Sequence, residues 1–271
     1  MRFFNWLTKG PSDSAEVSIV SFRGCKFFSS DRNKIEAALR LPTDWYGRKR
    51  YDRLNFSVVE EILATGDVCF DVGANIGVYT CIFARLSGDS SNVHAFEPAE
   101  HIRKKLLRNI RLNGFDGVNV NSIGLGDQKS EKNFFEVKEG VFRGGVSSFV
   151  ENENIKIMRG EAIEERMVPV STLDSYVGDG NISKLKFLKI DVEGFELPVV
   201  RGGERVLGDL RPFILMEFDE SRHGEKIGEM KDFFGALGYE GLDPRLRGGR
   251  VEFNRWNFDK VPEARNILLI P

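Results

Sequence analysis

The chain of 271 residues is long enough for one large α/β domain, or for a standard domain with an appendage. It is 41% hydrophobic and 30% charged, and its 39 basic and 41 acidic residues leave a formal net charge of −2, which disfavours a dedicated nucleic-acid-binding protein because such proteins usually carry a basic domain. Its three cysteines form no CxxC pair and lie at no metal-ligand spacing with histidine, so a disulfide scaffold and a zinc module are excluded.

Nothing in the sequence predicts insertion into a membrane. No apolar run approaches the roughly 20 residues that a membrane span needs. The start, Met1–Leu7, is too short and too quickly interrupted for a signal peptide. We therefore expect a cytoplasmic protein with no membrane span and no nucleic-acid partner.

Residues 1–65 form an N-terminal extension that does not follow the strand–helix alternation of the rest of the chain. A hairpin-like stretch covers Val17–Phe28 and turns near Gly24, and helical patterns cover 31–40 and 52–64. Segments outside the sheet of an α/β protein often carry specificity. We therefore expect this extension to bind the acceptor or to contact a second copy in a homodimer, and a structural cap is the alternative interpretation.

From residue 66 to the end of the chain, strands and helices alternate. Continuous apolar runs with β-branched residues are typical of buried parallel strands, and helices between them imply right-handed crossovers. The predicted parallel strands are Val68–Val72, Val93–Phe96, Val118–Ile123, Phe187–Ile190 and Phe213–Met216. The predicted helices are Ile76–Leu86, one that opens at Pro98 and stops at Asn113, and Leu197–Leu207. This pattern predicts a doubly wound, mostly parallel α/β sheet.

A segment at about 128–180 interrupts the alternation and is predicted to be an insertion within a 66–271 domain. It contains the strand-like run Asn133–Val137 and a Ser147-Ser148 pair, and it is a second candidate for acceptor binding. A helix is expected over Glu225–Leu237, and the last strands, which include an antiparallel edge hairpin, are expected at Tyr239–Leu242, Arg250–Phe253 and Asn266–Ile270.

The segment Asp71–Gly77 leads from a predicted strand into a predicted helix. Glycine permits the tight turn, and the N-terminus of the following helix presents backbone N–H groups to a ligand. Glu97 lies twenty residues after Gly77 at the end of the second strand. A carboxylate there accepts hydrogen bonds from both ribose hydroxyls of an adenosine ligand. The turn and the acid together predict an adenosine-containing cofactor.

S-adenosylmethionine (SAM) suits this turn better than a dinucleotide does. A dinucleotide fingerprint has a second glycine that lets the backbone approach the pyrophosphate, and Asn75 stands at that position. Asp71, expected to face the ligand, would repel a pyrophosphate but suits the ammonium and sulfonium groups of SAM. The alternatives are an NAD-dependent oxidoreductase or nucleotide-sugar epimerase on a Rossmann-type fold, and a turn that merely connects strand and helix.

A second cluster of charged residues, Leu188–Glu196, ends the fourth predicted strand. Lys189 interrupts an otherwise buried strand, so its charge needs a partner or open solvent. Asp191 is expected beside the aspartate of the glycine turn, facing the reactive end of the cofactor. Transfer of a methyl group to an alcohol requires a positioned acceptor and a group that removes its proton. Asp191 is the leading candidate and Glu193 the next, whereas Glu196 is better interpreted as a helix N-terminal acid.

Two further candidates lie near the end of the fifth predicted strand. His223 could serve as a general base, with a solvated loop histidine as the alternative. Glu217 and Asp219 could join Asp191 as oxygen ligands of a divalent cation. Because no clear ligand pattern is present, we predict no metal. The predicted catalytic residues are Asp191, Glu193 and His223.

Several motifs, in their order and spacing, resemble the FkbM family of SAM-dependent methyltransferases. The resemblance covers about residues 60 to 220, and its most specific part is the run Lys-Ile-Asp-Val-Glu-Gly-Phe-Glu. The motifs are Asp71–Gly77, Ala95–Pro98, Gly124–Asp127, Ser147-Ser148, Ser171–Asp174 and Leu188–Glu196. The resemblance implies a class I Rossmann-like methyltransferase fold with a seven-stranded sheet.

The resemblance also implies a cofactor and an acceptor. SAM would be the methyl donor and S-adenosylhomocysteine the product, and the acceptor would be a small molecule or glycan bearing a hydroxyl group. The residues implied to bind SAM are Asp71, Gly73, Ala74, Asn75, Gly77, Glu97, Pro98, Ser122, Ile123 and Asp191. We predict a SAM-dependent O-methyltransferase of a carbohydrate or natural product, and a non-catalytic SAM-binding module is the remaining alternative.

Overall fold

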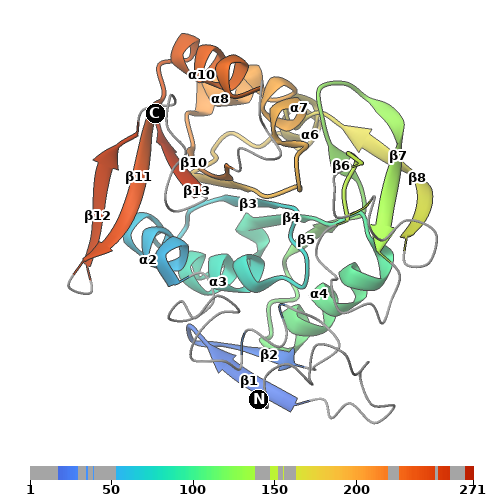
Figure 1. Ribbon diagram of the computed structural model, residues 1–271. Coiled ribbons are helices and arrows are strands. Elements are labelled where there is room, and N and C mark those ends of the chain that lie inside the picture. The colour runs from blue at the N-terminus through green and yellow to red at the C-terminus, as the bar shows by residue number, and fades with distance from the viewer. Residues whose placement is uncertain are drawn as a thin grey trace, which may run out of the picture.

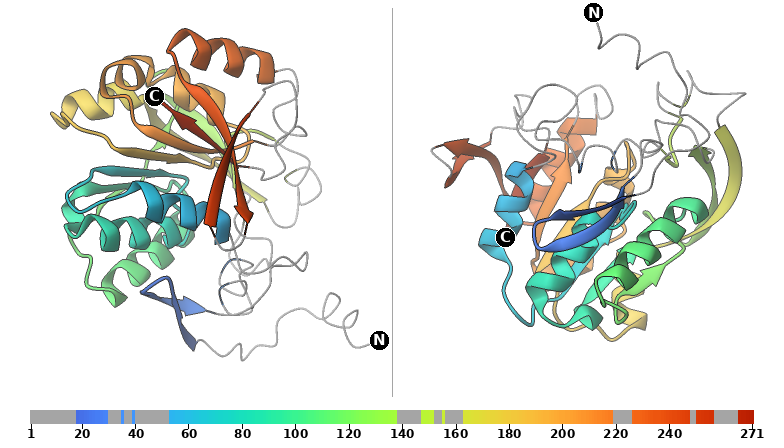
Figure 2. Two further views of the ribbon diagram at one scale, coloured as in Figure 1. Left: turned by 90° about the vertical axis from the view of Figure 1, so that its left-hand side faces the viewer. Right: turned by 90° about the horizontal axis from the view of Figure 1, so that it is seen from below.

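The computed structural model describes residues 18–29, 35, 39, 53–137, 147–151, 155, 163–218, 226–247, 250–256 and 266–271. Within these residues, a central sheet lies between two layers of helices (Figure 1). Two further views show the same layering (Figure 2). The doubly wound α/β architecture predicted from the sequence is confirmed.

The central sheet has a parallel core and an antiparallel edge. The parallel strands are β5 (Asn119–Asn121), β4 (Val93–Phe96), β3 (Cys69–Val72), β9 (Phe187–Ile190) and β10 (Phe213–Glu217). The antiparallel strands are β13 (Asn266–Ile270), β11 (Glu240–Arg247) and β12 (Arg250–Arg255). The order across the sheet is β12-β11-β13-β10-β9-β3-β4-β5. Every residue of β3 and β9 is buried, as expected for strands covered by helices on both faces.

The prediction of seven strands was wrong. Within the described residues the central sheet has eight strands. The eighth is β12, which corresponds to the strand predicted at Arg250–Phe253; it folds back on β11 and pairs with it from Leu242–Arg255 to Arg247–Arg250. Side chains along β12 are mostly exposed, so charged residues can occupy this outer edge.

Helices cover both faces of the sheet (Figure 1). On one face lie α2 (Arg53–Ile62), α3 (Val78–Ser87) and α4 (Glu100–Leu112), with the short 3-10 helix η1 (Ser90–Asn92) after α3. On the other lie α6 (Leu173–Asp179), α7 (Glu196–Arg201), α8 (Glu204–Leu210) and α10 (Lys226–Ala236). The predicted helix Leu197–Leu207 is in fact the two helices α7 and α8. The break falls at Gly202, where a Cβ atom would lie 1.9 Å from the Gly126 carbonyl oxygen, so glycine is required at this close approach.

A second, smaller sheet contains two strands of the predicted insertion, β7 (Ser130–Val137) and β8 (Ile163–Ser171). Its third strand, β6 (Gly124–Leu125), precedes the insertion, and the order is β6-β8-β7. Phe135 and Ser148 form a further antiparallel bridge, which brings the Ser147-Ser148 pair against β7. The insertion therefore lies beside the main sheet rather than within it.

The N-terminal hairpin packs on the layer that contains α3 and α4. It consists of β1 (Ser18–Phe22) and β2 (Cys25–Ser29). Asn113, at the end of α4, bonds both the N–H (2.7 Å) and the carbonyl oxygen (2.7 Å) of Lys26. Asn109 accepts from the Phe28 N–H at 3.0 Å. These side-chain amides satisfy backbone groups of the hairpin in place of a third strand.

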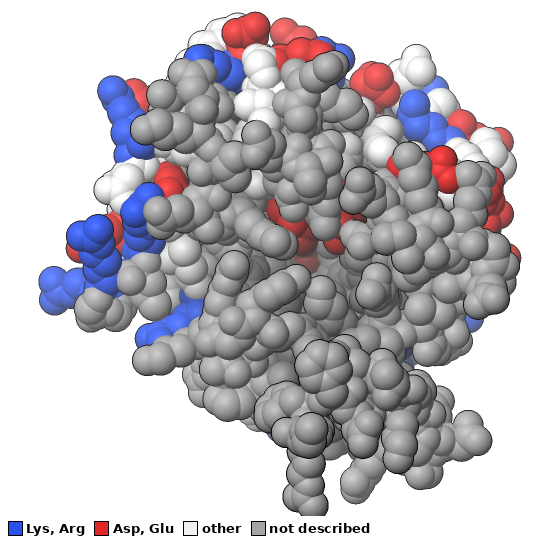
Figure 3. All heavy atoms as spheres, viewed as in Figure 1, with Lys and Arg blue, Asp and Glu red and all other residues white. Residues whose placement is uncertain are grey.

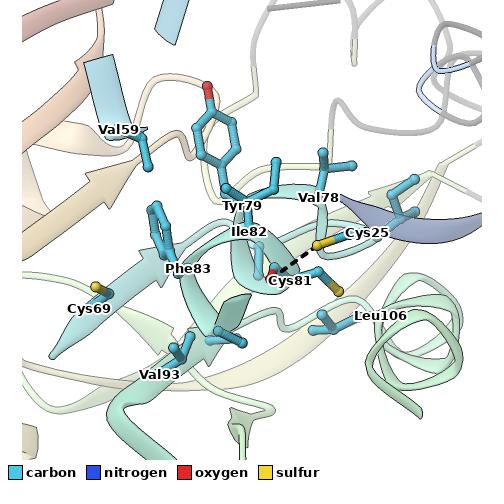
Figure 4. Close-up of a cluster of buried hydrophobic side chains, with 14 of the residues drawn as sticks. Cys25, Val59, Cys69, Val78, Tyr79, Cys81, Ile82, Phe83, Val93 and Leu106 are labelled. Carbon is cyan, nitrogen blue, oxygen red and sulfur yellow. Dashed lines mark hydrogen bonds between the residues drawn. The ribbon is translucent and has the colours of Figure 1, made fainter. Parts of the chain in front are cut away.

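One hydrophobic cluster joins the hairpin to the rest of the protein. Its buried residues include Phe27 of the hairpin, Phe56 of α2 and Phe83 of α3. The Cys25 thiol donates to the Cys81 carbonyl oxygen at 3.4 Å within this cluster (Figure 4). Residues on both sides of position 65 thus share one core, and the division into 1–65 and 66–271 stays a prediction.

Among the helices that the described residues form, none combines the length and the hydropathy that crossing a bilayer requires.

Candidate active site

A pocket of about 580 Å³ opens at the carboxyl ends of β3, β4 and β9. The chain runs from β3 to β4 and β5 on one side and from β9 to β10 on the other, so the pocket lies where the strand order reverses. Ligands of open α/β sheets bind at this place. Residues that line the pocket and were predicted from the sequence are Gly73, Asn75, Glu97, Pro98, Ile123, Asp191 and Glu193.

The glycine turn forms one wall of the pocket. Gly73 has φ +77°, and a Cβ atom there would lie 1.9 Å from the Asp191 carbonyl oxygen. The backbone N–H groups of Gly73 and Ala74 both donate to the Phe96 carbonyl oxygen, at 3.1 and 3.0 Å. Asn75 has φ +51°, and Gly77, with φ +84°, immediately precedes α3. Ala74 and Gly77 shape this turn but do not line the pocket.

Glu97 is a buried acid on the opposite side of the same turn. Its two carboxylate oxygens accept hydrogen bonds from the N–H groups of Asn75 (2.9 Å) and Ala99 (2.8 Å). Burial raises the pKa of Glu97 to about 7, although these hydrogen bonds and the charges of Arg103 and Lys189 act to lower it. The carboxylate is thereby held at the pocket with its orientation determined by the backbone.

Asp71 does not face the pocket, contrary to the sequence prediction. It is fully buried, accepts a 2.6 Å hydrogen bond from the Thr80 hydroxyl, and lies 3.4 Å from the Lys189 ammonium. In the parallel register Asp71 is directly opposite Lys189 on β9, so the two side chains share one face of the sheet. The carboxylate therefore neutralises a buried lysine. Any contact of Asp71 with a cofactor stays a prediction.

Lys189 also contacts the turn after β9, which forms the second wall of the pocket. Its ammonium lies 3.5 Å from the Asp191 carboxylate and donates to the Gly73 carbonyl oxygen at 3.1 Å. Asp191 begins the turn after β9, and its N–H donates to the Val72 carbonyl oxygen at 3.0 Å. The lysine that interrupts an apolar strand thus finds two carboxylates. Asp71 and Asp191 are near each other, as expected from the sequence, because both contact the Lys189 ammonium.

The turn after β9 is held by side chains on two sides. Glu196 accepts from the N–H groups of Val192 (3.0 Å) and Gly194 (3.3 Å), as expected for an acid at the start of a helix. The Ser148 hydroxyl donates to the Glu193 carbonyl oxygen at 3.1 Å. Glu193 itself has φ +57°, which the surrounding contacts maintain.

Three carboxylates converge at the end of the parallel sheet. Asp191, Glu193 and Glu217 each offer one oxygen, and these oxygens lie within 4.8 Å of one another. Acidic side chains are visible near the centre of one face of the molecule (Figure 3). Carboxylates at this spacing can hold a divalent cation or accept hydrogen bonds from the hydroxyls of an acceptor. Asp219 and His223, also predicted here, lie outside the described residues.

The sequence motifs do not predict the aromatic part of the pocket. Phe134 and Phe149 have ring centroids 4.8 Å apart and line the pocket with Ile102. Ser147 and Ser148 line it too. These residues come from α4 and the insertion, so only the Ser147-Ser148 motif marked them in the sequence.

Neither Ser122, which was predicted to bind the cofactor, nor His94 lines the pocket. Ser122 is exposed and does not line the pocket, whereas its neighbour Ile123 does. His94 lies in β4, where its Nδ1 is 2.8 Å from the Tyr176 hydroxyl and burial lowers its pKa to about 4. His94 is therefore a neutral residue of the fold.

Comparison with known protein families shows where this chain belongs. The family model for the methyltransferase FkbM domain matches residues 71–240, a range that holds both pocket walls. The chain belongs to the FkbM methyltransferase family. The predicted class I methyltransferase fold, with SAM as its cofactor, is thereby confirmed at the level of the family.

Three relatives have similar sequence identity to this chain, but the matches cover different shares of it. The 31-O-demethyl-FK506 methyltransferase FkbM of Streptomyces tacrolimicus is 28% identical over 65% of this chain and 70% of its own length. The hexuronic acid methyltransferase AglP of Haloferax volcanii is 29% identical over 80% of both chains. Methyltransferase 1 of Beauveria bassiana is 29% identical over 56% of this chain and 64% of its own. The chain thus spans less than two thirds of that fungal relative.

Among solved structures, the methyltransferase FkbM of Methylobacillus flagellatus KT is 14% identical, with a TM-score of 0.47. The match covers 76% of this chain and 44% of that one.

Proposed function

We propose that this FkbM-family protein is a SAM-dependent O-methyltransferase whose acceptor is a hydroxyl group of a carbohydrate or natural product. The observation that carries the proposal is one pocket with two unlike walls. The glycine turn and Glu97 form the first wall, and the turn with Asp191 and Glu193 forms the second.

The first wall fits the cofactor. Glu97 presents a carboxylate whose oxygens can accept from ribose hydroxyls, and Gly73 and Asn75 of the glycine turn line the pocket beside it. Ile102, Ile123 and Phe149 offer an apolar surface for an adenine ring. When bound, SAM supplies a methyl group already activated on a sulfonium. The protein then has to position the acceptor and remove its proton.

The second wall fits a hydroxylated acceptor. Asp191, with 40% of its side chain exposed, and Glu193 line the pocket and can accept hydrogen bonds from hydroxyl groups. One of them would take the proton as the methyl–oxygen bond forms, with Asp191 as the leading candidate. The names of two relatives support this acceptor class, since one specifies a hexuronic acid and the other a 31-O-demethyl compound.

A labelling experiment tests the proposal. The protein is incubated with methyl-labelled SAM and a panel of glycans, sugar acids and polyketide alcohols, and labelled products are identified by mass spectrometry. We expect label on oxygen, and Asp191→Asn should lower the rate at least 30-fold while SAM still binds. SAM binding without transfer to any acceptor would indicate a non-catalytic binding module. Thermal stabilisation by NAD but not by SAM would contradict the assigned cofactor.

A further inference from the structure

We propose that Lys189 is a positioning residue of this site. It holds the Gly73 carbonyl group and the Asp191 carboxylate in one arrangement, so that a single buried ammonium joins the cofactor wall to the acceptor wall. The inference rests on the proposed function, because it assigns Lys189 a role in the same methyl transfer.

The ammonium group is enclosed and fully engaged. Only 7% of the Lys189 side chain is exposed. Its nitrogen lies 3.1 Å from the Gly73 carbonyl oxygen, 3.4 Å from Asp71 and 3.5 Å from Asp191. The ring of Tyr79 lies 5.0 Å from the same nitrogen. A lysine has three N–H donors and no acceptor, and here oxygens of three residues, Asp71, Gly73 and Asp191, surround it.

These three partners are not equivalent. Asp71 is fully buried and already fixed by the Thr80 hydroxyl at 2.6 Å, so it anchors the ammonium. Asp191 has a 40% exposed side chain at the pocket, where an unrestrained carboxylate would sample several rotamers. The Lys189 contact therefore restricts Asp191 more than it restricts Asp71.

The contact with Gly73 extends this effect to the cofactor wall. Gly73 and Asp191 are already adjacent, because a Cβ atom at Gly73 would lie 1.9 Å from the Asp191 carbonyl oxygen. Lys189 adds a hydrogen bond to the Gly73 carbonyl oxygen from beside that contact. Removal of the ammonium should therefore loosen both walls together.

The test must separate positioning from neutralisation of Asp71. Lys189→Met alone would leave the Asp71 carboxylate buried without its cation, and the variant could fail to fold. The double variant Lys189→Met/Asp71→Asn removes both charges, and an asparagine oxygen can still accept from Thr80. Comparing this variant with Asp71→Asn alone isolates the contribution of Lys189, and Lys189→Arg is the conservative variant that keeps a cation.

We measure SAM affinity by isothermal titration calorimetry and methyl transfer by single-turnover labelling. Relative to Asp71→Asn, the double variant should bind SAM about 5-fold more weakly and transfer methyl at least 30-fold more slowly. Lys189→Arg should restore the rate to within about 5-fold of the wild type. Adding Asp191→Asn to the double variant should lower the rate little further, because Lys189 acts through Asp191.

Two outcomes would overturn the role of Lys189. SAM affinity in the double variant within 2-fold of that in Asp71→Asn would show that Lys189 only neutralises Asp71. If Asp191→Asn lowers the rate of the double variant by the same factor as it lowers the rate of the wild type, Lys189 does not act through Asp191. Failure of the proposed function is a separate result, since a wild type that binds SAM without transferring methyl still permits the affinity comparison.

Discussion

The protonation state of Glu97 should control cofactor binding. It is buried at the pocket, and burial raises its pKa to about 7 from an ordinary 4.5. Since the pKa in the folded protein exceeds that in the unfolded chain, its stabilising contribution is fully present below pH 4.5 and is lost as the pH rises through about 7. The ionised form that destabilises the empty protein is also the better acceptor for ribose hydroxyls.

SAM affinity should therefore increase with pH. If only ionised Glu97 binds the ribose, the ionised fraction rises about tenfold between pH 6 and pH 8, and the dissociation constant for SAM should fall by about the same factor. Calorimetry at both pH values measures this change. Glu97→Gln should bind more weakly and show no such pH dependence. An equal dependence in this variant would assign the titration to another group.

At the scale of elements, the glycine turn and the turn after β9 depend on a close backbone approach. Gly73→Ala would combine an unfavourable φ of +77° with a Cβ atom 1.9 Å from the Asp191 carbonyl oxygen. We expect it to lower the free energy of unfolding by more than about 3 kcal/mol, because the ends of β3 and β9 must separate.

Gly66→Ala is the matched control, since Gly66 has φ +87° and no atom within 4 Å of its Cβ position. This control should lose about 1–2 kcal/mol, the cost of the left-handed conformation alone. Urea denaturation measures both variants. Equal losses would mean that backbone conformation, rather than the close approach, requires glycine at Gly73.

Ser148 connects the insertion to the acidic turn. Its hydroxyl donates to the Glu193 carbonyl oxygen at 3.1 Å and accepts from the Val150 N–H at 3.0 Å. Ser148→Ala leaves both groups without this partner, so we expect a loss of about 1–3 kcal/mol in the free energy of unfolding. Methyl transfer should fall about tenfold, because Glu193 would be less well held.

Ser147→Ala provides the comparison for this prediction. The Ser147 hydroxyl accepts from the Val137 N–H within the insertion, at 3.0 Å. We expect a similar loss of stability but a smaller loss of methyl transfer. Equal kinetic losses would show that the insertion acts as a whole rather than through Ser148.

At the scale of the whole molecule, the N-terminal segment belongs to the main hydrophobic core. Phe27 and Phe56 are fully buried in the same cluster as Phe83, and α2 also contributes Val59. We propose that residues 1–65 stabilise the fold in addition to any role at the acceptor site. Their predicted part in a homodimer stays a prediction, which light scattering of the intact chain checks.

A chain that starts at residue 66 should not fold cooperatively. It would lack several fully buried side chains, among them Phe27, Phe56 and Val59, each of which contributes about 1.5–3 kcal/mol. That sum is comparable to the whole stability of a typical domain. Calorimetry and near-UV circular dichroism measure the effect. A cooperative transition at the melting temperature of the full chain would show that residues 1–65 are a dispensable cap.

The amino-acid sequence by itself determined the local features of this protein. The apolar runs of β3 and β9, the turn at Gly73 and the acid Glu97 follow from hydrophobic periodicity, glycine geometry and spacing, which act over a few residues. From these and the motifs around them, the doubly wound fold, the cofactor class and most of the pocket could be predicted.

Only the tertiary structure decided which distant residues meet. It turned Asp71 towards Lys189, brought Ser148 and Phe149 of the insertion to the pocket and split one predicted helix at Gly202. These outcomes depend on strand register and on the packing of one element against another. Local sequence patterns encode the period of an element but not its partner.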